Sequence, residues 1–418
     1  MAVSPRYLPI TLDLTKKHAA TYFARKVEEG KKRGFSKFQI RVFEGSAIFP
    51  NAAVPVAGLI DFYRSEGLQF MSSKSIEANG RVRNAGVLKA YDDPSGFRPP
   101  SFLGKVWAFT ADTHYEIVTG ILDSLRLSIK IADGLLPCLE LCLNEVTDNV
   151  LNHSCEGISK SPKGFVMAQA HRGSNRVAIT VFDYGLGILK TLSHADASIT
   201  TPEGAIRASI KKGVTSGLGL GNGLWVLDRI VARNRGSFEI TSDGYFYFKK
   251  HNDHDGEAEV STSPIMTMTS GTTTVDFQID VGRPIEISSV LDGYMPADLW
   301  SEDREAVDRE GWIELDMKKE SRKIGFGTRT AARQMSTLIS NVFNSGREGV
   351  ILDFRDVEMM STSYADELLK ELLVVDLSGE SVAIRNVAEN ARLSIEEVLK
   401  DSSYEKDGVD KVKKMLAR

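Results

Sequence analysis

The sequence feature that most constrains the fold is a glycine-rich segment that leads directly into a predicted helix. In TSGLGLGNGLWVLDRIV, every second residue is glycine before a helix expected at Leu224–Asn234. The glycines are Gly217, Gly219, Gly221 and Gly223. Exposed backbone N–H groups at a helix N-terminus favour an anion. No Gly-Lys-Ser/Thr ends the segment, so it is not a P-loop, and its context excludes a dinucleotide fingerprint. We expect a phosphate-binding loop, with a flexible loop that binds nothing as the alternative.

A second feature is an acidic and amide-bearing face on a helix expected at Pro137–Asn152. Glu145, Asp148, Asn149 and Asn152 lie at positions i, i+3, i+4 and i+7, so they share one face. The opposite, core-facing side carries Leu139, Leu143, Val146 and Val150. No Lys or Arg balances the polar face, and Mg²⁺ prefers such oxygen ligands. A polar face turned simply to water is the alternative.

A third feature is Asp183-Tyr-Gly185-Leu-Gly187, directly after a strand expected at Arg176–Phe182. Glycine allows a sharp turn beside the acidic side chain. Asp183 could accept a hydrogen bond from an exocyclic amine such as that of adenine. An ordinary turn is the alternative.

In order and spacing, these motifs resemble the GHKL, or Bergerat-fold, ATP-binding family, which includes gyrase-type ATPases, histidine kinases and anti-sigma-factor serine kinases. The resemblance covers roughly residues 105–282. It implies an α/β (α+β) fold with a central Bergerat-type α/β sandwich. Helices would cover one face of its mixed sheet, and two smaller STAS-like α/β modules would flank it.

The resemblance also implies ATP and Mg²⁺ as cofactors and a role for each motif residue. Asn149 resembles the asparagine that coordinates Mg²⁺, and Glu145 the general base that acts on water or a hydroxyl nucleophile. Asp183 resembles the acceptor of the adenine amine, with Gly185 and Gly187 shaping the base pocket. The four alternating glycines resemble those of the ATP lid and the phosphate-facing helix start.

Further residues extend the resemblance or depart from it. Thr272, in SGTTTVDF, resembles the strand threonine that supports adenine through its hydroxyl and a water. No histidine-kinase dimerisation box precedes the domain, which leaves His114 only as an alternative phosphoacceptor. No transducer domain with a catalytic lysine is recognisable after residue 282. Lys211 and Lys212 could reach phosphate, but a solvated lysine pair is the commoner explanation.

Changes in composition along the chain predict three domains and a linker. Residues 1–104 form a small α/β module, for which a STAS-like fold is one option, and residues 105–282 the ATP-binding domain. A linker at 283–312 precedes a STAS-like domain at 313–418. The polar stretch His251–Ser263 is expected to be a loop.

The C-terminal segment is similar to a STAS-like domain of uncharacterised function, a relative of anti-sigma-factor antagonists. A strand expected at Gly349–Phe354 precedes a helix expected at Ser363–Val374. Ser361 and Ser363 at that helix start are candidate phosphoacceptors by this resemblance, although helix capping alone also explains serine there. Tyr364 departs from the small residue usual after that serine.

Composition narrows the partners and the compartment. The chain of 418 residues has 52 Lys and Arg against 56 Asp and Glu, a formal net charge of −4. This balance argues against a nucleic-acid binder held by bulk basicity. No apolar run is long enough for a transmembrane helix. Three clustered cysteines do not form a disulfide framework, so we expect a cytoplasmic protein.

Three functions follow from these expectations. The first is a Mg-dependent ATP-binding protein that hydrolyses ATP as a conformational switch coupled to STAS-like interaction domains. The second is a protein serine kinase of the anti-sigma-factor type that phosphorylates a STAS-like domain, and the third is a non-catalytic nucleotide-gated scaffold. A protein partner is expected through the STAS-like domains, and a homodimer is left open.

Overall fold

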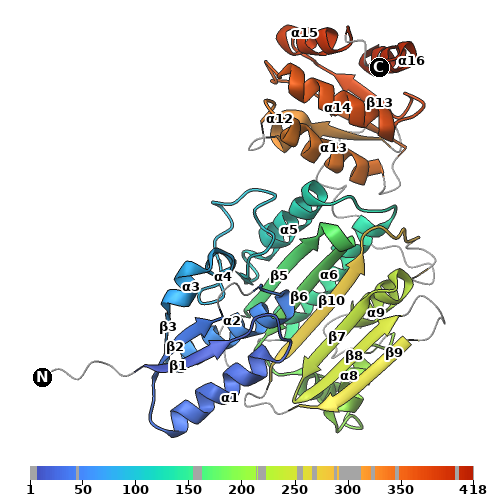
Figure 1. Ribbon diagram of the computed structural model, residues 1–418. Coiled ribbons are helices and arrows are strands. Elements are labelled where there is room, and N and C mark those ends of the chain that lie inside the picture. The colour runs from blue at the N-terminus through green and yellow to red at the C-terminus, as the bar shows by residue number, and fades with distance from the viewer. Residues whose placement is uncertain are drawn as a thin grey trace, which may run out of the picture. The chain divides into compact units, whose positions relative to one another are not determined.

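The computed structural model describes the chain in two compact units (Figure 1). Unit 1 comprises Met1–Ser124 and Glu140–Asp280, and unit 2 comprises Leu125–Leu139 and Val281–Arg418. The described residues are all except 1–6, 44–46, 154–161, 213, 215–222, 252–257, 266–270, 287–289, 291–311, 322–324, 344–347, 401–403 and 418. Most of the linker expected at 283–312 therefore lies outside the described residues.

Unit 1 is built on a seven-stranded sheet with the strand order β4-β5-β6-β10-β7-β8-β9. Its strands are β4 (Trp107–Phe109), β5 (Gly164–His171), β6 (Arg176–Asp183), β7 (Ser237–Ser242), β8 (Tyr245–His251), β9 (Ala258–Pro264) and β10 (Thr273–Asp280). All its ladders are antiparallel, where a mixed sheet was expected. Hairpins explain the difference: Asp243 (φ 51°) and Gly244 (φ 76°) form a tight turn of the kind that joins antiparallel strands.

Two helices beside the large sheet, α6 (Leu135–His153) and α9 (Gly223–Asn234), agree with the helices predicted at Pro137–Asn152 and Leu224–Asn234. Helix α5 (His114–Ser128) precedes them in the chain. The residues predicted to form the core side of α6 are all buried: Leu139, Leu143, Val146 and Val150. Figure 1 shows α6 behind the large sheet and α2 (Pro50–Ser65) in front of it. The expected α/β architecture is confirmed, but the expectation that helices cover only one face of the large sheet was wrong, because α2 packs on the face opposite α6.

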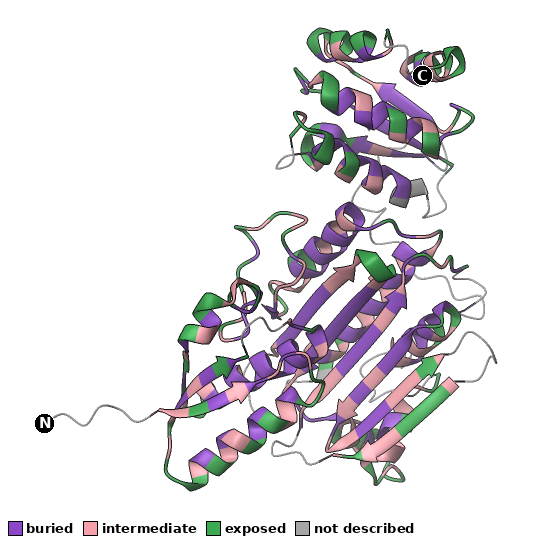
Figure 2. Ribbon diagram, in the orientation of Figure 1, coloured by how far each residue is buried: buried purple, intermediate pink, exposed green. Residues whose placement is uncertain are grey.

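A smaller parallel sheet of β1 (Leu8–Leu12), β2 (Lys37–Val42) and β3 (Gln69–Ser72) completes unit 1, together with α1 (Ala19–Lys32). One apolar cluster joins both sheets, because it contains Ile10 and Phe38 as well as Phe165 and Phe182 of the large sheet (Figure 2). The boundary predicted near residue 104 falls between the two sheets, and this shared core spans it.

Unit 2 contains a three-stranded parallel sheet of β11 (Trp312–Asp316), β12 (Gly349–Asp353) and β13 (Val382–Arg385). Its helices are α12 (Met317–Glu320), α13 (Arg329–Phe343), α14 (Thr362–Val375), α15 (Glu389–Val398) and α16 (Lys406–Ala417). The strand predicted at Gly349–Phe354 and the helix predicted at Ser363–Val374 match β12 and α14 to within a residue.

The loop expected at His251–Ser263 was wrong, because β8 runs to His251 and β9 begins at Ala258 and covers the rest of the stretch from there. Only residues 252–257 separate them, and these lie outside the described residues. As the last strand in the sheet, β9 has no buried residue and therefore shows no apolar alternation. The remaining short elements are α3 (Lys74–Ala78), α4 (Gly80–Ala85), η1 (Arg172–Ser174), α7 (Ile188–Ala195) and α8 (Pro202–Ser209).

Candidate functional site

The polar face of α6 meets the start of α9. A Cβ atom added at Gly223 would lie 2.6 Å from Oε2 of Glu145 and 3.1 Å from Nδ2 of Asn149. The first of these contacts is too short for any side chain, so glycine is required unless Glu145 moves. The structure therefore brings together the last of the four alternating glycines and the acid–amide pair.

Glu145 is an unusual carboxyl group because burial, together with the nearby charge of Asp148, raises its pKa. Glu145 is partly buried, whereas Asp148 is exposed. A carboxylate with a raised pKa is a stronger base than an ordinary surface carboxylate. Glu145 is therefore suited to accept a proton from a nucleophile held beside Gly223.

His114 of α5 lies against the same stretch of α6. Its Nε2 is 2.6 Å from Oγ1 of Thr147 and 3.7 Å from Oδ1 of Asp148. The Thr147 hydroxyl donates to the carbonyl of Leu143, so its oxygen is available to accept from His114. Burial lowers the pKa of His114 and so favours the neutral ring, while the charge of Asp148 opposes this shift. This packing gives His114 a position in the site that the sequence did not indicate.

Asp183 forms the second part of the site, at the end of β6. Its Oδ1 accepts a hydrogen bond of 2.8 Å from the backbone N–H of Gly185, which closes the turn. Burial raises the Asp183 pKa to about 7, and the charge of Asp243 acts in the same direction. The remaining acceptor capacity of this carboxylate suits a hydrogen-bond donor on a ligand.

The glycines after Asp183 are fixed by close contacts with distant segments. A Cβ at Gly187 (φ 80°) would lie 2.2 Å from Oδ1 of Asp243, and one at Gly271 would lie 2.2 Å from the carbonyl oxygen of Gly185. Asp243 in turn accepts a hydrogen bond of 2.8 Å from the N–H of Leu189. These contacts hold the turn of Gly185 and Gly187 against the ends of β7 and β10. Sequence reasoning missed Asp243, because nothing links it to the turn along the chain.

Thr272 was expected to assist Asp183, but the register of β10 and β6 places the next residue, Thr273, opposite Asp183. Thr272 precedes β10, whereas Thr273 is paired with Asp183 on β6 and with Ser242 on β7. Paired residues share one face of a sheet. The Thr273 hydroxyl lies 3.2 Å from that of Ser242. Thr273 and Ser242 are therefore the hydroxyl groups on the face of Asp183, and sequence reasoning missed both.

The rest of the glycine-rich segment lies outside the described residues, including Gly217, Gly219 and Gly221. Of the two lysines before it, Lys212 lies over the ring of Trp225, with its Nζ 4.8 Å from the ring centroid. The far end of α9 is anchored to β10. The Asn234 side chain donates to the Asp280 carbonyl at 2.8 Å and accepts from the Asp280 N–H at 2.7 Å.

The side chains near Gly223 limit which kind of metal ion could bind there. Among the described residues, no group of three or more His, Cys, Asp or Glu side chains could hold a metal ion by itself. Mg²⁺ is usually held by one or two protein oxygens together with water and substrate phosphates. The Glu145–Asn149 pair beside Gly223 fits that arrangement and does not fit a metal held by protein alone.

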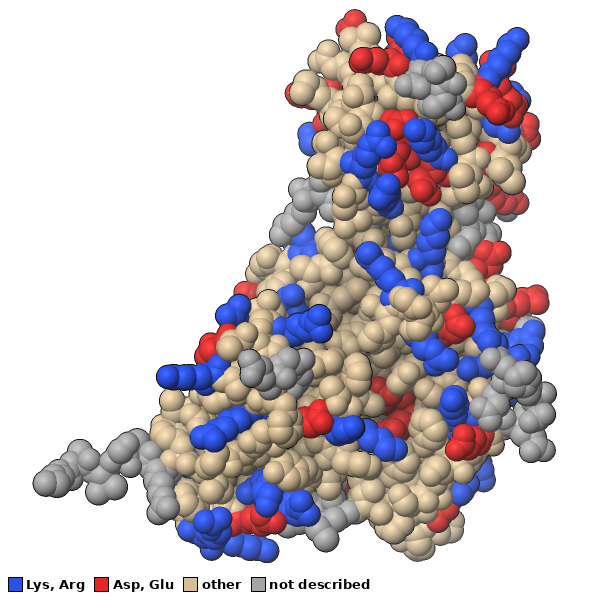
Figure 3. Space-filling view, viewed as in Figure 1, with Lys and Arg blue, Asp and Glu red and all other residues tan. Residues whose placement is uncertain are grey.

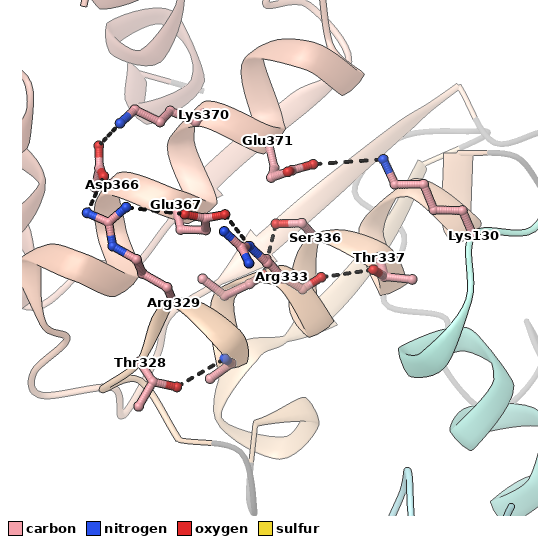
Figure 4. A network of polar contacts seen from close by, with 12 residues as sticks. Lys130, Thr328, Arg329, Arg333, Ser336, Thr337, Asp366, Glu367, Lys370 and Glu371 are labelled. Carbon is pink, nitrogen blue, oxygen red and sulfur yellow. Dashed lines mark hydrogen bonds and ion pairs between the residues drawn. The ribbon is translucent and has the colours of Figure 1, made fainter. Parts of the chain in front are cut away.

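In unit 2, the candidate phosphoacceptors lie at the start of α14. Ser361 is the N-cap: its Oγ accepts from the N–H of Tyr364 at 3.0 Å and donates to the Gly327 carbonyl at 3.0 Å. Ser363 is exposed in the first helical turn. Farther along, Glu367 faces Arg333 and Arg329 of α13, as Figure 4 shows.

The distribution of surface charge concerns the prediction about nucleic acid, and the length of the helices concerns the prediction about membranes. On the visible face, Figure 3 shows basic and acidic side chains interspersed, without a continuous basic patch. None of the described helices is both long enough and apolar enough to cross a membrane.

Comparisons with known proteins give only distant likenesses. No family model and no curated protein matches the sequence. The ATPase region of Saccharomyces cerevisiae topoisomerase II bound to ICRF-187 (dexrazoxane) is 18% identical, with 34% of this chain and 38% of that chain covered and a TM-score of 0.22. For the 43K ATPase domain of Thermus thermophilus gyrase B in complex with an aminocoumarin, the identity is 16%, the coverages 39% and 37%, and the TM-score 0.21.

The topoisomerase IV ATP-binding domain of Francisella tularensis in complex with a small-molecule inhibitor is 14% identical, with coverages of 47% and 46% and a TM-score of 0.23. The chain thus spans less than half the length of each of these structures. The likenesses are too low to establish a function, which must come from this chain's own residues.

Proposed function

We propose that unit 1 binds ATP with Mg²⁺ and hydrolyses it slowly, as a conformational switch. The observation that carries this proposal is the contact of Gly223 with both Glu145 and Asn149. It combines a helix N-terminus suited to phosphate, an amide oxygen suited to Mg²⁺ and a carboxylate with a raised pKa.

Each residue has a separate task in this proposal. Asn149 would supply the protein ligand to Mg²⁺, whose chemistry is to neutralise charge on the phosphates. Glu145 orients the nucleophile and accepts its proton, which is the main help that phosphoryl transfer needs from a protein side chain. Asp183 accepts a hydrogen bond from the base amine, while Gly185 and Gly187 shape the pocket around it.

The lid role of Gly217, Gly219 and Gly221 and the supporting role of Thr272 remain predictions from the sequence. Thr273 is the better candidate for that supporting role, because it is paired with Asp183. We also propose that residues 313–418 form a STAS-like domain that passes the nucleotide state to a protein partner. The homodimer and the cytoplasmic location likewise remain predictions.

A protein serine kinase is the second candidate function, and the exposure of Ser363 favours it. Ser363 lies in the first turn of α14, where a phosphate would be favoured by the helix dipole. Ser361 is less suited to modification, because its hydroxyl already makes two hydrogen bonds.

Incubation of the full chain with γ-labelled ATP and Mg²⁺ tests the proposal. Free labelled phosphate supports the hydrolase, label retained on the protein supports the kinase, and binding without turnover supports the scaffold. Glu145→Gln should retain ATP binding and lose turnover by about 10²-fold or more, the usual contribution of a general base.

Asn149→Ala should weaken Mg·ATP binding, with Asn152→Ala as the matched control, because Asn152 is exposed on the same face of α6. Equal Mg·ATP affinity of the Asn149→Ala variant and the parent would overturn the metal assignment. If retained label survives Ser363→Ala and Ser361→Ala together, these serines are not the phosphoacceptors.

A further inference from the structure

Tyr184 links the turn after Asp183 to the opposite face of the large sheet. It stands between Asp183 and Gly185, but its hydroxyl donates to Oδ2 of Asp61 on α2 at 2.9 Å. Its ring centroid lies 5.7 Å from that of Phe62 and 6.0 Å from that of Phe165. Asp183 and Tyr184 thus bind different partners, although they are neighbours in the chain.

Asp61 is held in place from a second side by Lys163. The Lys163 Nζ lies 3.0 Å from Oδ1 and 2.9 Å from Oδ2 of Asp61. Both side chains are about one-third exposed, at 29% and 34%, so solvent only partly screens the pair. Lys163 directly precedes Gly164, which is paired with Asp183 across β5 and β6. The hydrogen-bonded group of Tyr184, Asp61 and Lys163 therefore lies beside the strand end that carries Asp183, on the side of α2.

Burial keeps Tyr184 in the form that this group needs. Desolvation is the main cause that raises the Tyr184 pKa, and the charge of Asp61 adds to it. The phenol therefore remains a neutral donor at physiological pH, and Asp61 accepts its proton in the hydrogen bond.

The packing of α2 is tight at the same place. A Cβ at Gly58 would lie 2.2 Å from ring carbons of Phe182 and 3.2 Å from the ring of Phe165. Gly58 is one helical turn before Asp61, and Phe182 is two residues before Tyr184. The helix thus contacts the strand at two successive points that face α2, and Asp183 lies between them in sequence.

We propose that Tyr184 is a positioning residue for the base-binding turn, and that through it the docking of α2 sets the affinity for nucleotide. The inference rests on the proposed ATP site. Coupling of this kind is reciprocal, so bound nucleotide must also stabilise the docking of α2. The small N-terminal sheet and α2 then sense or control the nucleotide state of the large sheet.

The test is a set of conservative variants of the full chain. Tyr184→Phe keeps the ring and removes the hydroxyl, and Asp61→Asn keeps an acceptor oxygen and removes the charge. Tyr184→Phe should weaken ATP binding, measured by calorimetry with Mg²⁺, by about five- to twentyfold, with a smaller loss for Asp61→Asn. The double variant should lose little more than Tyr184→Phe alone, because the hydroxyl through which Asp61 acts on Tyr184 is already absent in Tyr184→Phe.

Hydrogen exchange separates positioning from a loss of fold. In the parent, ATP should slow exchange of α2 amides, and in Tyr184→Phe this effect should be largely lost while the exchange without ATP stays similar. Tyr22→Phe, on the exposed side of α1, is the matched control and should behave as the parent.

The possible failures are distinguishable. If the parent and Tyr184→Phe bind ATP equally well, or if ATP protects α2 equally in both, the inference is wrong and the proposed function stands. If the parent does not bind ATP, the proposed function is wrong and the inference falls with it.

Discussion

At the scale of single residues, the site depends on a glycine at position 223, because a methyl group there would be too close to Glu145. Gly223 begins α9 in contact with Glu145 and Asn149, which lie far from it in sequence. Gly223 is the first residue of α9 and is not a core residue. Its substitution therefore changes the site without removing core packing.

Gly223→Ala should lower ATP turnover at least about tenfold while the melting temperature stays the same or rises. The added Cβ displaces the Glu145 carboxylate, whereas alanine in place of glycine commonly stabilises a compatible position by about 0.4–1 kcal/mol. Steady-state phosphate release and thermal denaturation check the two effects. Gly80→Ala, at the first residue of α4, is the matched control, because the nearest atom to an added Cβ there is Nη2 of Arg83 at 4.0 Å, an ordinary contact. Unchanged turnover in Gly223→Ala would show that Glu145 does not act at this contact.

Single residues also show where sequence reasoning stops. Glu145, Asn149 and Asp183 could be chosen because their chemistry is visible in short motifs. Thr272 was preferred to Thr273 because a motif does not fix which residue of a strand faces its neighbour, and a shift of one position changes the face. Asp243 could not be found at all, since only the folded β7–β8 turn brings it to Gly187.

At the scale of elements, the apolar sequence of α2 indicates how the helix is buried. Its segment NAAVPVAGLI contains almost no polar residue, and the helix is buried nearly all round. A helix that is apolar on every side must be covered on every side. In unit 1 this cover comes from the large sheet on one side and from α1 and β3 on the other.

Gly58→Ala should destabilise unit 1 by about 1–3 kcal/mol, the usual cost of overpacking a dense core. The new methyl group has no room, because Phe182 lies 2.2 Å from its position. Urea denaturation measures the change, and Gly80→Ala again provides a helical glycine with free space beside it. A variant as stable as the parent would mean that α2 shifts away from the sheet without cost.

At the scale of the whole molecule, an acidic pair crosses the large sheet on the face that packs against α2. Asp276 of β10 is paired with Glu239 of β7, and Thr180 donates to Oδ1 of Asp276 at 2.6 Å. Burial raises the pKa of Asp276 to about 6 and that of Glu239 to about 8, while Lys17 opposes the shift of Glu239. The folded chain therefore binds more protons than the unfolded chain between the ordinary carboxyl pKa and about 8.

Stability should therefore fall as the pH rises through this range, because the native state holds protons that the unfolded state releases. Glu239→Gln should reduce this fall and stabilise the chain at pH 8 by on the order of 1–2 kcal/mol, since one pKa unit corresponds to about 1.4 kcal/mol. Urea unfolding from pH 5 to pH 8 measures the slope, with Glu259→Gln on exposed β9 as the control. An identical slope in Glu239→Gln and the parent would contradict this account.

The overall architecture could be predicted only as far as local patterns reach. Strand β6 and helices α6 and α9 followed from periodicity and turn residues, as did the order of the motifs. The strand order of the large sheet, in which β10 lies between β6 and β7, did not follow from the sequence. Pairing between strands that are distant in the chain leaves no local sequence pattern. Polar β9 shows the same limit, since an edge strand needs no apolar alternation.

The place of β10 in the strand order has a consequence for how unit 1 is made. This strand lies between β6 and β7, yet it follows β9 in the chain, so the strands on its two sides are synthesised before the strand that joins them. Until residue 280 has left the ribosome, the facing edges of β6 and β7 have no partner between them, and open edges invite pairing with other chains. The strand that carries Thr273 therefore both joins β6 to β7 and completes the surroundings of Asp183, so a nascent chain acquires its candidate nucleotide site only as it loses its most aggregation-prone edges.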